Sequence, residues 1–323
     1  MSAGIAVIGA GIAGLACARR LHEAGHAVAV FDKSRGPGGR MSTRRGDGWQ
    51  CDHGARYFTA QDPVFRAEVE RWQQAGVAAP WAARPRVIGS GPMHEADPST
   101  VRYVGTPRMT APARLLADGL DLAVGHTIVE LCCDDDGWQL VSAEHGPLAG
   151  RYSAVLVAVP APQAMPLLEP IAPALAGLAG AARMTGCWTL MLRYAAPPPL
   201  PFEAAFVNRG PLRWIARDSG KPDRTGAECW VLQATAEWSE AHLEEEPEQV
   251  ATQLLDAFAE LGGPPPAAWS AHRWRYADSR PGRTPGSAWD PALGLGLCGD
   301  WLAGNSVESA WLSGRALAEL VAG

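Results

Sequence analysis

Three closely spaced glycines are the first residues of this chain whose type and spacing could do chemistry. Gly9, Gly11 and Gly14 follow a short apolar run, and apolar residues then recur at the spacing of a helix. Asp32 closes a second apolar run, 21 residues after Gly11. Glycines so placed let the backbone approach a pyrophosphate, whose charge is met by amides at the helix start, and the carboxylate can bind ribose hydroxyls. The pattern predicts dinucleotide binding, with an ordinary tight turn as the alternative.

Two further segments favour FAD over NAD, which shares the glycine pattern. Residues 35–40 (RGPGGR) follow the second apolar run, so paired glycines can offer amides to a second phosphate or the ribityl chain, and Arg40 adds a cation. Residues 52–58 (DHGARYF) join a turn of small residues to polar and aromatic side chains, which predicts a wall beside the flavin ring. Read separately, the first could be a solvent loop and the second a simple turn and strand.

A second strand-turn-helix pattern lies far along the sequence, in residues 298–310. Asp300 can bind ribityl or ribose hydroxyls. Either Asn305 or Ser306 can cap the helix that follows, and Glu308 suits its first turn. The positive end of that helix would stabilise a reduced, anionic flavin. Extended FAD needs a binding segment this far from the glycine turn, and plain helix capping is the alternative.

Residues 272–276 (HRWRY) alternate as a strand does, which predicts that His272, Trp274 and Tyr276 share one face while the two arginines share the other. Aromatic side chains could stack on a nicotinamide or frame the flavin, and Arg275 could meet substrate phosphates. The substrate-pocket candidates are Trp274, Tyr276, His272 and Arg275, although aromatic strands are more often core. Further pocket aromatics, each better explained as core, are Trp188, Trp214 and Trp311.

These motifs together resemble the renalase-like branch of the flavin amine oxidase superfamily, in its bacterial form. The similarity runs almost end to end: VIGAGIAGL at 7–15, GPGGRMSTR at 36–44, DHGARYFT at 52–59, HRWRYA at 272–277, GDW at 299–301 and VESAWLSG at 307–314. The first and last motifs occur across the superfamily. The last motif combines GDW with VESAWLSG, and the three between, GPGGRMSTR, DHGARYFT and HRWRY, are more particular to the branch.

The resemblance implies an α/β flavoprotein of two domains, a Rossmann-like βαβ FAD domain and an interleaved substrate domain with a mixed sheet. It implies an oxidase that takes hydride from isomeric dihydro-NAD(P), the 2- or 6-dihydronicotinamide forms, and gives NAD(P)⁺ and, with molecular oxygen, hydrogen peroxide. Loss of hydride from a dihydropyridine restores aromaticity, so the protein has mainly to place the donor carbon and shield the ring. The sequence agrees, since it offers no nucleophile with a matched base and no metal cluster.

Most of the FAD-binding candidates come from the glycine turn and from the motifs of the resemblance. They are Gly9, Gly11, Ile12, Ala13, Gly14, Asp32, Lys33, Gly39, Arg40, Gly54, Ala55, Arg56, Tyr57, Val129, Gly299, Asp300, Ser306 and Val307. Cys298 lies within the predicted strand and not in the turn where related enzymes attach their cofactor, so we expect noncovalent FAD.

An amine oxidase proper is the main alternative. Such relatives commonly place a lysine near flavin N5 through water. The two lysines of this chain are Lys33, beside Asp32 at the adenosine end, and Lys221, in a polar turn, and neither is an obvious counterpart. A flavin dehydrogenase with another electron acceptor, or a flavin protein whose redox state regulates a partner, is a second alternative.

Composition argues against several classes of function. The net charge of -6 leaves no excess basic surface for nucleic acid. The sequence has no apolar run of about eighteen residues and no charged-then-apolar leader, which speaks against a membrane span and against export. Seven cysteines without a C-x-x-C pair predict reduced core thiols rather than disulfides or a zinc site. We therefore expect a cytoplasmic protein with no nucleic acid or membrane partner and with its oligomeric state left open, and the resemblance implies an oxidoreductase of NAD metabolism.

Particular elements must hold these residues. The sequence predicts a strand-turn-helix-strand unit over 5–32, a helix that begins at Asp62 and Pro63, a hairpin of strands 128–131 and 138–141, a helix along 250–261, and a final strand and helix over 293–320. We expect residues 1–60, 105–160 and 285–323 to form the FAD-binding domain. The substrate domain would then combine 61–104 and 161–284.

Overall fold

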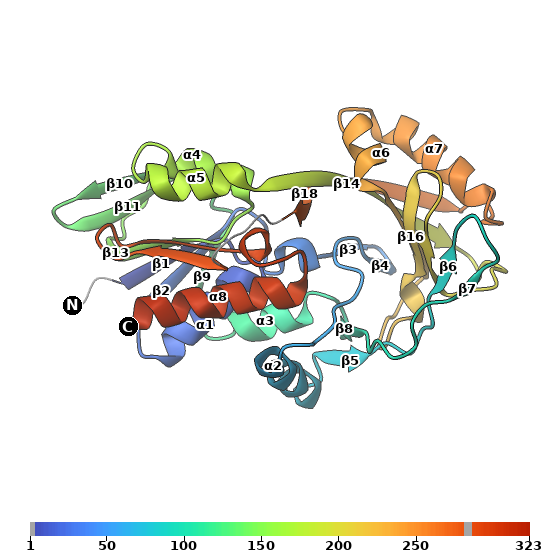
Figure 1. Ribbon diagram of the computed structural model, residues 1–323, viewed down its shortest axis with the longest axis horizontal. Helices are drawn as coiled ribbons and strands as arrows, with labels where there is room; N and C mark the ends of the chain where they lie inside the picture. The colour runs from blue at the N-terminus through green and yellow to red at the C-terminus, as the bar shows by residue number, and fades with distance from the viewer. Residues whose placement is uncertain (1–3, 281–285) are drawn as a thin grey trace.

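The computed structural model describes residues 4–280 and 286–323, which form two large β-sheets (Figure 1). Nine strands make up the first sheet and seven the second. The beginning, the middle and the end of the chain all contribute to the first sheet, so the chain crosses between the sheets more than once. The domain limits predicted at residues 1 and 285 lie outside the described residues.

The glycine-rich opening forms a Rossmann-like unit, as predicted. β1 (Gly4–Ile8) leads through the turn into α1 (Ile12–Glu23), and β2 (Val28–Asp32) pairs in parallel with β1. Two distant segments extend this parallel core. β13 (Tyr152–Val157) pairs with β1, and β20 (Leu295–Cys298) pairs with β13. β20 is buried along its whole length, which is typical of a parallel strand covered on both faces.

Helices cover both faces of this sheet (Figure 1). α1 shares one face with α3 (Ala111–Ala117) and α8 (Val307–Ala322), while the other face carries α4 (Ala161–Leu168) and α5 (Pro173–Ala181). α1 and α8 approach closely because Gly314 has no side chain. A Cβ there would lie 2.0 Å from the carbonyl oxygen of Ala13. Helices from the two ends of the chain are therefore in direct contact.

The predicted hairpin lies at one edge of the first sheet, and its strands run somewhat longer than expected. The strands that complete this sheet are β9 (Asp121–Val124), β10 (Ile128–Asp134), β11 (Gly137–Ser142), β12 (Gly146–Pro147) and β19 (Ser287–Asp290). β9 pairs in parallel with β2 and closes the opposite edge.

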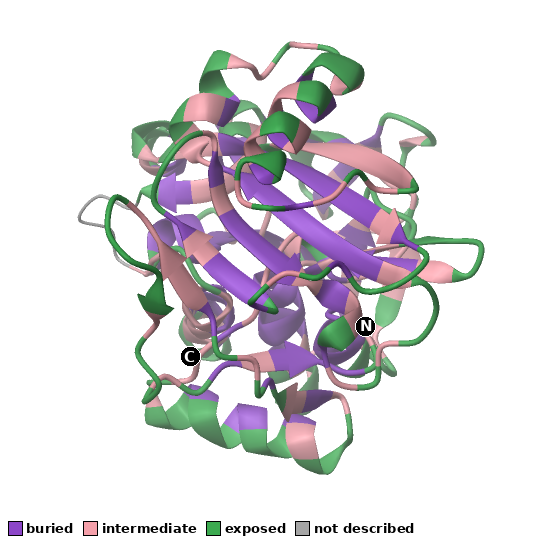
Figure 2. Cartoon of the chain, turned by 90° about the vertical axis from the view of Figure 1, so that its right-hand side faces the viewer, coloured by how far each residue is buried: buried purple, intermediate pink, exposed green. Residues whose placement is uncertain are grey.

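The second sheet is mixed, because β6 and β15 run parallel while its other pairs are antiparallel. Its strands, in spatial order, are β18 (Ala268–Arg280), β14 (Arg183–Tyr194), β17 (Glu228–Ala234), β16 (Leu212–Arg217), β15 (Ala204–Val207), β6 (Arg86–Ile88) and β7 (His94–Glu95). Buried residues run along its central strands (Figure 2). On one face α7 (Pro247–Ala259) packs over a core that includes Trp188 and Trp230, and α6 (Ala236–Ala241) lies against β14.

The remaining elements lie outside the two large sheets. They are η1 (Gly39–Met41), β3 (Thr43–Gly46), β4 (Trp49–Asp52), α2 (Pro63–Gln74), β5 (Ala78–Pro80), β8 (Tyr103–Gly105), η2 (Asp218–Gly220) and η3 (Asp300–Leu302). Asp62 caps α2 as predicted, since its carboxylate accepts hydrogen bonds from the amides of Val64 and Phe65.

The α/β fold class predicted from the sequence is confirmed, with a Rossmann-like unit and a second, mixed sheet. The helices expected after Asp62, after Pro247 and over the final residues are all present. In the described part of the chain, no helix is both long and apolar enough to cross a membrane.

Candidate active site

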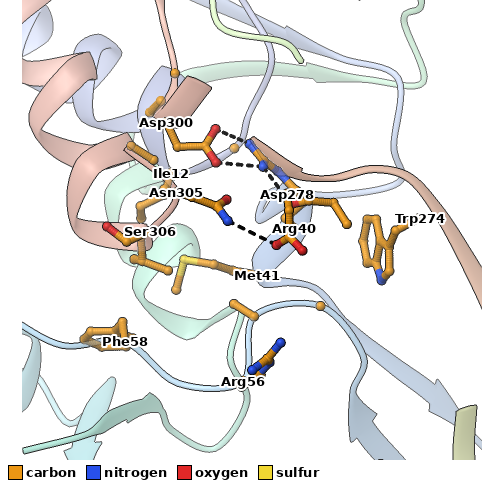
Figure 3. Close-up of a pocket in the computed structure, with 18 of the residues that line it drawn as sticks. Ile12, Arg40, Met41, Arg56, Phe58, Trp274, Asp278, Asp300, Asn305 and Ser306 are labelled. Carbon is orange, nitrogen blue, oxygen red and sulfur yellow. Dashed lines mark hydrogen bonds and ion pairs between the residues drawn. The ribbon is translucent and has the colours of Figure 1, made fainter. Parts of the chain in front are cut away.

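A cavity of about 400 Å³ opens between elements of the two sheets (Figure 3). On one side it is lined by the turn after β1, by η1, by η3 and by the start of α8. On the other side it is lined by residues of β14, β16, β17 and β18, and residues 54–59 run between the two sides. A ligand in this cavity would thus contact both ends of the chain and the second sheet.

The glycine turn has the shape that a diphosphate requires. Gly11 lines the cavity as the N-cap of α1, where no side chain caps the helix, so its first amides have no side-chain partner. A Cβ on Gly11 would meet nothing within 4 Å, whereas one on Gly14 would lie 2.0 Å from the carbonyl oxygen of Gly9. Open space at a helix start suits an anion, so these residues fit the phosphates of FAD.

Arg40 and Asp300, both predicted to bind the cofactor, contact each other in the cavity. The guanidinium donates to both carboxylate oxygens, at 2.8 and 2.5 Å, and also to the carbonyl oxygen of Ala277 at 3.1 Å. Asp300 is buried. This bidentate pair ties η1 to η3 beside the glycine turn, so the segment near the start and the segment near the end hold one wall together.

Asp32 lies just behind the glycine turn rather than in the cavity. Its carboxylate accepts hydrogen bonds from the amides of Ala10, at 2.6 Å, and of Ser34, at 2.7 Å. Predicted FAD residues that do not line the cavity are Gly9, Gly14, Asp32, Lys33, Gly39 and Val129. Lys33 and Val129 are exposed, and Val129 lies on β10.

The start of α8 resolves the choice of helix cap. Ser306 is the N-cap, since its hydroxyl accepts from the amide of Ser309 at 3.0 Å. Asn305 instead contacts β18, through the amide of Ser279 and the carboxylate of Asp278. The carboxylate of Glu308 accepts from the backbone amides of residues 61 and 62, so it connects α8 to the start of α2.

The segment 52–58 crosses the cavity as a closely packed turn. A Cβ on Gly54 would lie 2.0 Å from the carbonyl oxygen of Arg40, which accepts a hydrogen bond from the amide of Ala55. Ala55, Arg56, Tyr57 and also Phe58 line the cavity. Asp52 is fully buried behind them, with Lys221 and Arg224 on its carboxylate.

The second sheet supplies a wall that the motifs did not indicate. Gln233 on β17 accepts from Arg56 Nε at 2.7 Å and donates to the carbonyl oxygen of Gly54 at 2.7 Å. Arg213 on β16 forms an ion pair with Asp278 and donates to the thiol of Cys187. Cavity residues beyond the predicted set are Gly38, Met41, Phe58, Thr59, Ala158, Val159, Cys187, Arg213, Gln233, Ala277, Asp278, Trp301, Asn305 and Ala310.

β18 presents alternate side chains to its two faces, but only part of the predicted set reaches the cavity. Trp274 lines it, and its indole donates to the carbonyl oxygen of His53 at 2.8 Å. His272 packs against Trp274, with ring centroids 4.4 Å apart. Arg275 lies on the opposite face in an ion pair with Glu244, and neither Arg275 nor Tyr276 lines the cavity.

The two histidines beside Trp274 are neutral near pH 7. Burial lowers the pKa of His53 to about 3, with contributions from His272 and Arg44. Burial and then Arg44 lower the pKa of His272 to about 4. Nδ1 of His272 lies 3.3 Å from the guanidinium of Arg44, so it accepts that hydrogen bond. Trp274 thus lines the cavity on this side, and the two imidazole rings packed against it are uncharged.

The other aromatic and lysine candidates lie away from the cavity. Trp188, Trp214 and Trp311 are buried and do not line it. Lys221 is buried in ion pairs with Asp52 and Asp218, 3.0 and 2.7 Å away. Cys298 is buried within β20 and does not line the cavity, in keeping with noncovalent FAD. Among the described residues no group of side chains is arranged to hold a metal ion.

The sequences of known families and proteins match parts of this chain. A family model described as flavin containing amine oxidoreductase matches residues 97–322, and one described as an NAD(P)-binding Rossmann-like domain matches residues 7–72. The 4,4'-diapophytoene desaturase (4,4'-diaponeurosporene-forming) of Staphylococcus haemolyticus is 46% identical over 66 residues. That match covers 20% of this chain and 13% of the desaturase, so it is confined to a small part of either protein.

Solved structures match over the whole length. A protein of Exiguobacterium sp. 255-15, provisionally assigned as a protoporphyrinogen oxidase, has a TM-score of 0.79 at 13% identity. The match covers 100% of this chain and 99% of that protein's chain. Cyclohexylamine oxidase of Brevibacterium oxydans IH-35A has a TM-score of 0.76 at 15% identity, with coverage of 100% and 99%. At such identities the likeness shows the fold alone. The family model spans well over half of the chain, and together with the glycine turn it shows that the chain belongs to the flavin containing amine oxidoreductase family and is an FAD-dependent oxidoreductase.

Proposed function

We propose that this chain is a renalase-like oxidase of isomeric dihydro-NAD(P). It takes hydride from the 2- or 6-dihydronicotinamide forms and releases NAD(P)⁺. FAD, when bound, would supply a hydride acceptor and a route for both electrons to molecular oxygen, which with one further proton gives hydrogen peroxide. The cofactor set that we propose is the one predicted from the motifs apart from Arg56, with Gly11, Arg40 and Asp300 at its centre.

One observation carries this proposal: among the described residues that line the cavity, no carboxylate, amine or imidazole is left free. They include no lysine, histidine or glutamate, and both of their aspartates are held in ion pairs with arginines. The thiol of Cys187 is kept protonated, because burial raises its pKa. A dihydropyridine gives up hydride without proton abstraction, so such a substrate needs what this cavity offers, which is position and shielding.

Trp274 is the residue that we place against the substrate. Its indole is fixed by the hydrogen bond to the carbonyl of His53 and by the neutral ring of His272. A flat, uncharged wall of this kind can stack on a nicotinamide ring. His272 then acts as a positioning residue, while Arg275 and Tyr276 are not carried forward as substrate contacts because neither lines the cavity.

The predicted domains and cell compartment belong to the same proposal. We propose an FAD-binding domain of residues 1–60, 105–160 and 285–323, supported by the strands that those segments give to the first sheet. Residues 61–104 and 161–284 would form the substrate domain around the second sheet, although α4 and α5 within the latter segment pack on the first sheet. A cytoplasmic location is supported by the seven cysteines, all of which are free thiols.

Anaerobic stopped-flow spectroscopy tests the proposed substrate. The visible flavin band is followed after mixing with 2- and 6-dihydronicotinamide isomers, with ordinary NADH, and with an amine panel that includes cyclohexylamine. Fast bleaching by the isomers alone is the expected result. Bleaching by amines and not by the isomers would replace the proposal with an amine oxidase, the activity of one structural neighbour.

A further inference from the structure

The charges that line the cavity do not balance. Five charged side chains line it, and four of these form the pairs Arg40 with Asp300 and Arg213 with Asp278. The fifth is Arg56. Within the described residues, no carboxylate lies at ion-pairing distance from the Arg56 guanidinium, so one cation in the cavity is left without a counter-charge.

The direct contacts of Arg56 are polar or aromatic but uncharged, and the ion pair of Arg213 with Asp278 lies close by. Its Nε donates to Gln233 at 2.7 Å, and its guanidinium carbon lies 5.5 Å from the centre of the Trp214 ring. Burial, and then the neighbouring Arg213, lower the pKa of Arg56 to about 10, so the side chain remains a cation at neutral pH. A buried cation is costly unless an anion accompanies it.

Arg56 faces the substrate side of the cavity rather than the cofactor side. Both of its contacts come from the second sheet, Gln233 on β17 and Trp214 on β16, whereas the glycine turn and the start of α8 lie across the cavity. In Figure 3 its guanidinium points into the space between its own segment and Asp278. Since Nε is bound to Gln233, the terminal nitrogens of the guanidinium are the donors left for a ligand.

We propose that Arg56 binds an anionic oxygen of the substrate, a phosphate or a carboxylate, and so selects anionic substrates over cationic ones. The inference rests on the proposed function for the dinucleotide identity of the substrate, but its charge preference stands on the cavity alone. A planar guanidinium with free terminal nitrogens suits a phosphate or carboxylate in bidentate geometry. A positively charged alkylammonium would meet a second cation at this position.

Binding measurements with three probes test Arg56. Nicotinamide mononucleotide carries a phosphate, benzoate a carboxylate, and nicotinamide riboside neither. Dissociation constants are read from perturbation of the visible flavin band in the FAD-loaded protein. The variants are Arg56→Gln and Arg56→Lys, with Arg102→Gln as the matched control, because Arg102 is a buried arginine 5.4 Å from the neighbouring Tyr57 ring and does not line the cavity.

Arg56→Gln is expected to weaken the anionic probe that uses this site roughly ten- to a hundredfold, the usual contribution of a hydrogen bond to a charged group. Arg56→Lys should recover part of the affinity, since the charge remains without the planar fork. Arg102→Gln should bind all probes as the unchanged protein does. If Arg56→Gln loses affinity for the mononucleotide alone, the group bound by Arg56 is a phosphate. If it loses affinity for benzoate alone, that group is a carboxylate.

Two results would overturn the inference. Equal weakening of the riboside and of both anions would mean general damage to the cavity. Unchanged probe affinities with a shifted flavin midpoint potential would assign Arg56 to the cofactor. These outcomes are separate from the proposed function: if dihydronicotinamide isomers fail to reduce the flavin while the anion preference still depends on Arg56, the substrate proposal fails and this one stands.

Discussion

Gly11 and Gly14 lie within one turn, yet the structure gives them different tasks. A side chain at Gly14 would collide with the carbonyl oxygen of Gly9, 2.0 Å from its Cβ, so this glycine permits close packing inside the protein. A side chain at Gly11 would meet no protein atom within 4 Å and would enter the cavity. The space at Gly11 is therefore kept for a ligand, and the two roles can be separated by substitution.

Gly11→Ala is expected to lower FAD retention while leaving the melting temperature of the FAD-free chain unchanged. The added methyl occupies the space predicted for a phosphate, and overpacking of this kind costs about 1–3 kcal/mol, or roughly tenfold or more in affinity. The measurement is the flavin-to-protein absorbance ratio after purification, with thermal unfolding of the FAD-free protein. Gly36→Ala is the control, since its Cβ also meets nothing within 4 Å but does not line the cavity. Full FAD content in Gly11→Ala would contradict the assignment.

For single residues, the sequence was informative at positions where cofactor chemistry allows only a few residue types. Glycine spacing and the acidic and basic partners pointed to Gly11, Arg40 and Asp300, all of which line the cavity. Gln233 and Arg213 carry no such signal, because a polar residue within an ordinary strand looks the same whether it faces solvent or a cavity. The ion pair between Arg40 and Asp300 could not be predicted either, because nothing in the local sequence indicates a contact between residues 260 positions apart.

The side-chain alternation predicted for β18 holds over residues 272–275 but not beyond them. Its alternation sends His272 and Trp274 to one face and Arg275 to the other, as expected. Cys187 of β14 pairs with Trp274, and Thr185 pairs with Asp278. Between these two pairs β14 advances by two residues while β18 advances by four. The irregularity changes how the strand continues beyond Trp274. Asp278 lines the cavity and Tyr276 does not, and no feature of the strand's sequence signals this shift.

The neutral histidines of this wall predict a pH dependence of stability. The pKa values of His53 and His272, about 3 and about 4, are below the ordinary value for histidine, so the unfolded chain binds protons near pH 6 that the folded chain does not. Their contribution to the free energy of unfolding is therefore present above about pH 6.5 and is lost as pH falls toward 4. Urea unfolding of the protein at several pH values between these limits should show falling stability.

His272→Gln should make that fall shallower, because one titrating group is removed and glutamine can still accept from Arg44. His94→Gln, at an exposed histidine on β7, is the matched control and should keep the original slope. A His272→Gln profile parallel to that of the unchanged protein would show that the ring does not stay neutral in the fold.

At the scale of the whole molecule, segments from near both ends of the chain meet at the cavity. β20 joins the parallel core beside β13, and α8 packs on α1, so the first and last motifs become neighbours. The resemblance to the flavin amine oxidase superfamily, which assigned residues 1–60 and 285–323 to one domain, implied that these segments meet. The pairing order of the second sheet was not predictable in the same way, since its strands carry similar apolar patterns and only long-range packing decides which of them meet.

Gly314→Ala tests whether this closure supports cofactor binding. The Cβ would lie 2.0 Å from the carbonyl oxygen of Ala13, so α8 must move away from α1, and both helices begin at the cavity. We expect a loss of about 1–3 kcal/mol in the free energy of unfolding together with lower FAD content. Gly177→Ala, in α5 with nothing within 4 Å of its Cβ, should instead gain up to about 1 kcal/mol from helix propensity. Thermal unfolding and the flavin absorbance ratio measure both effects, and loss of stability with full FAD content would show that the α1–α8 contact is structural only.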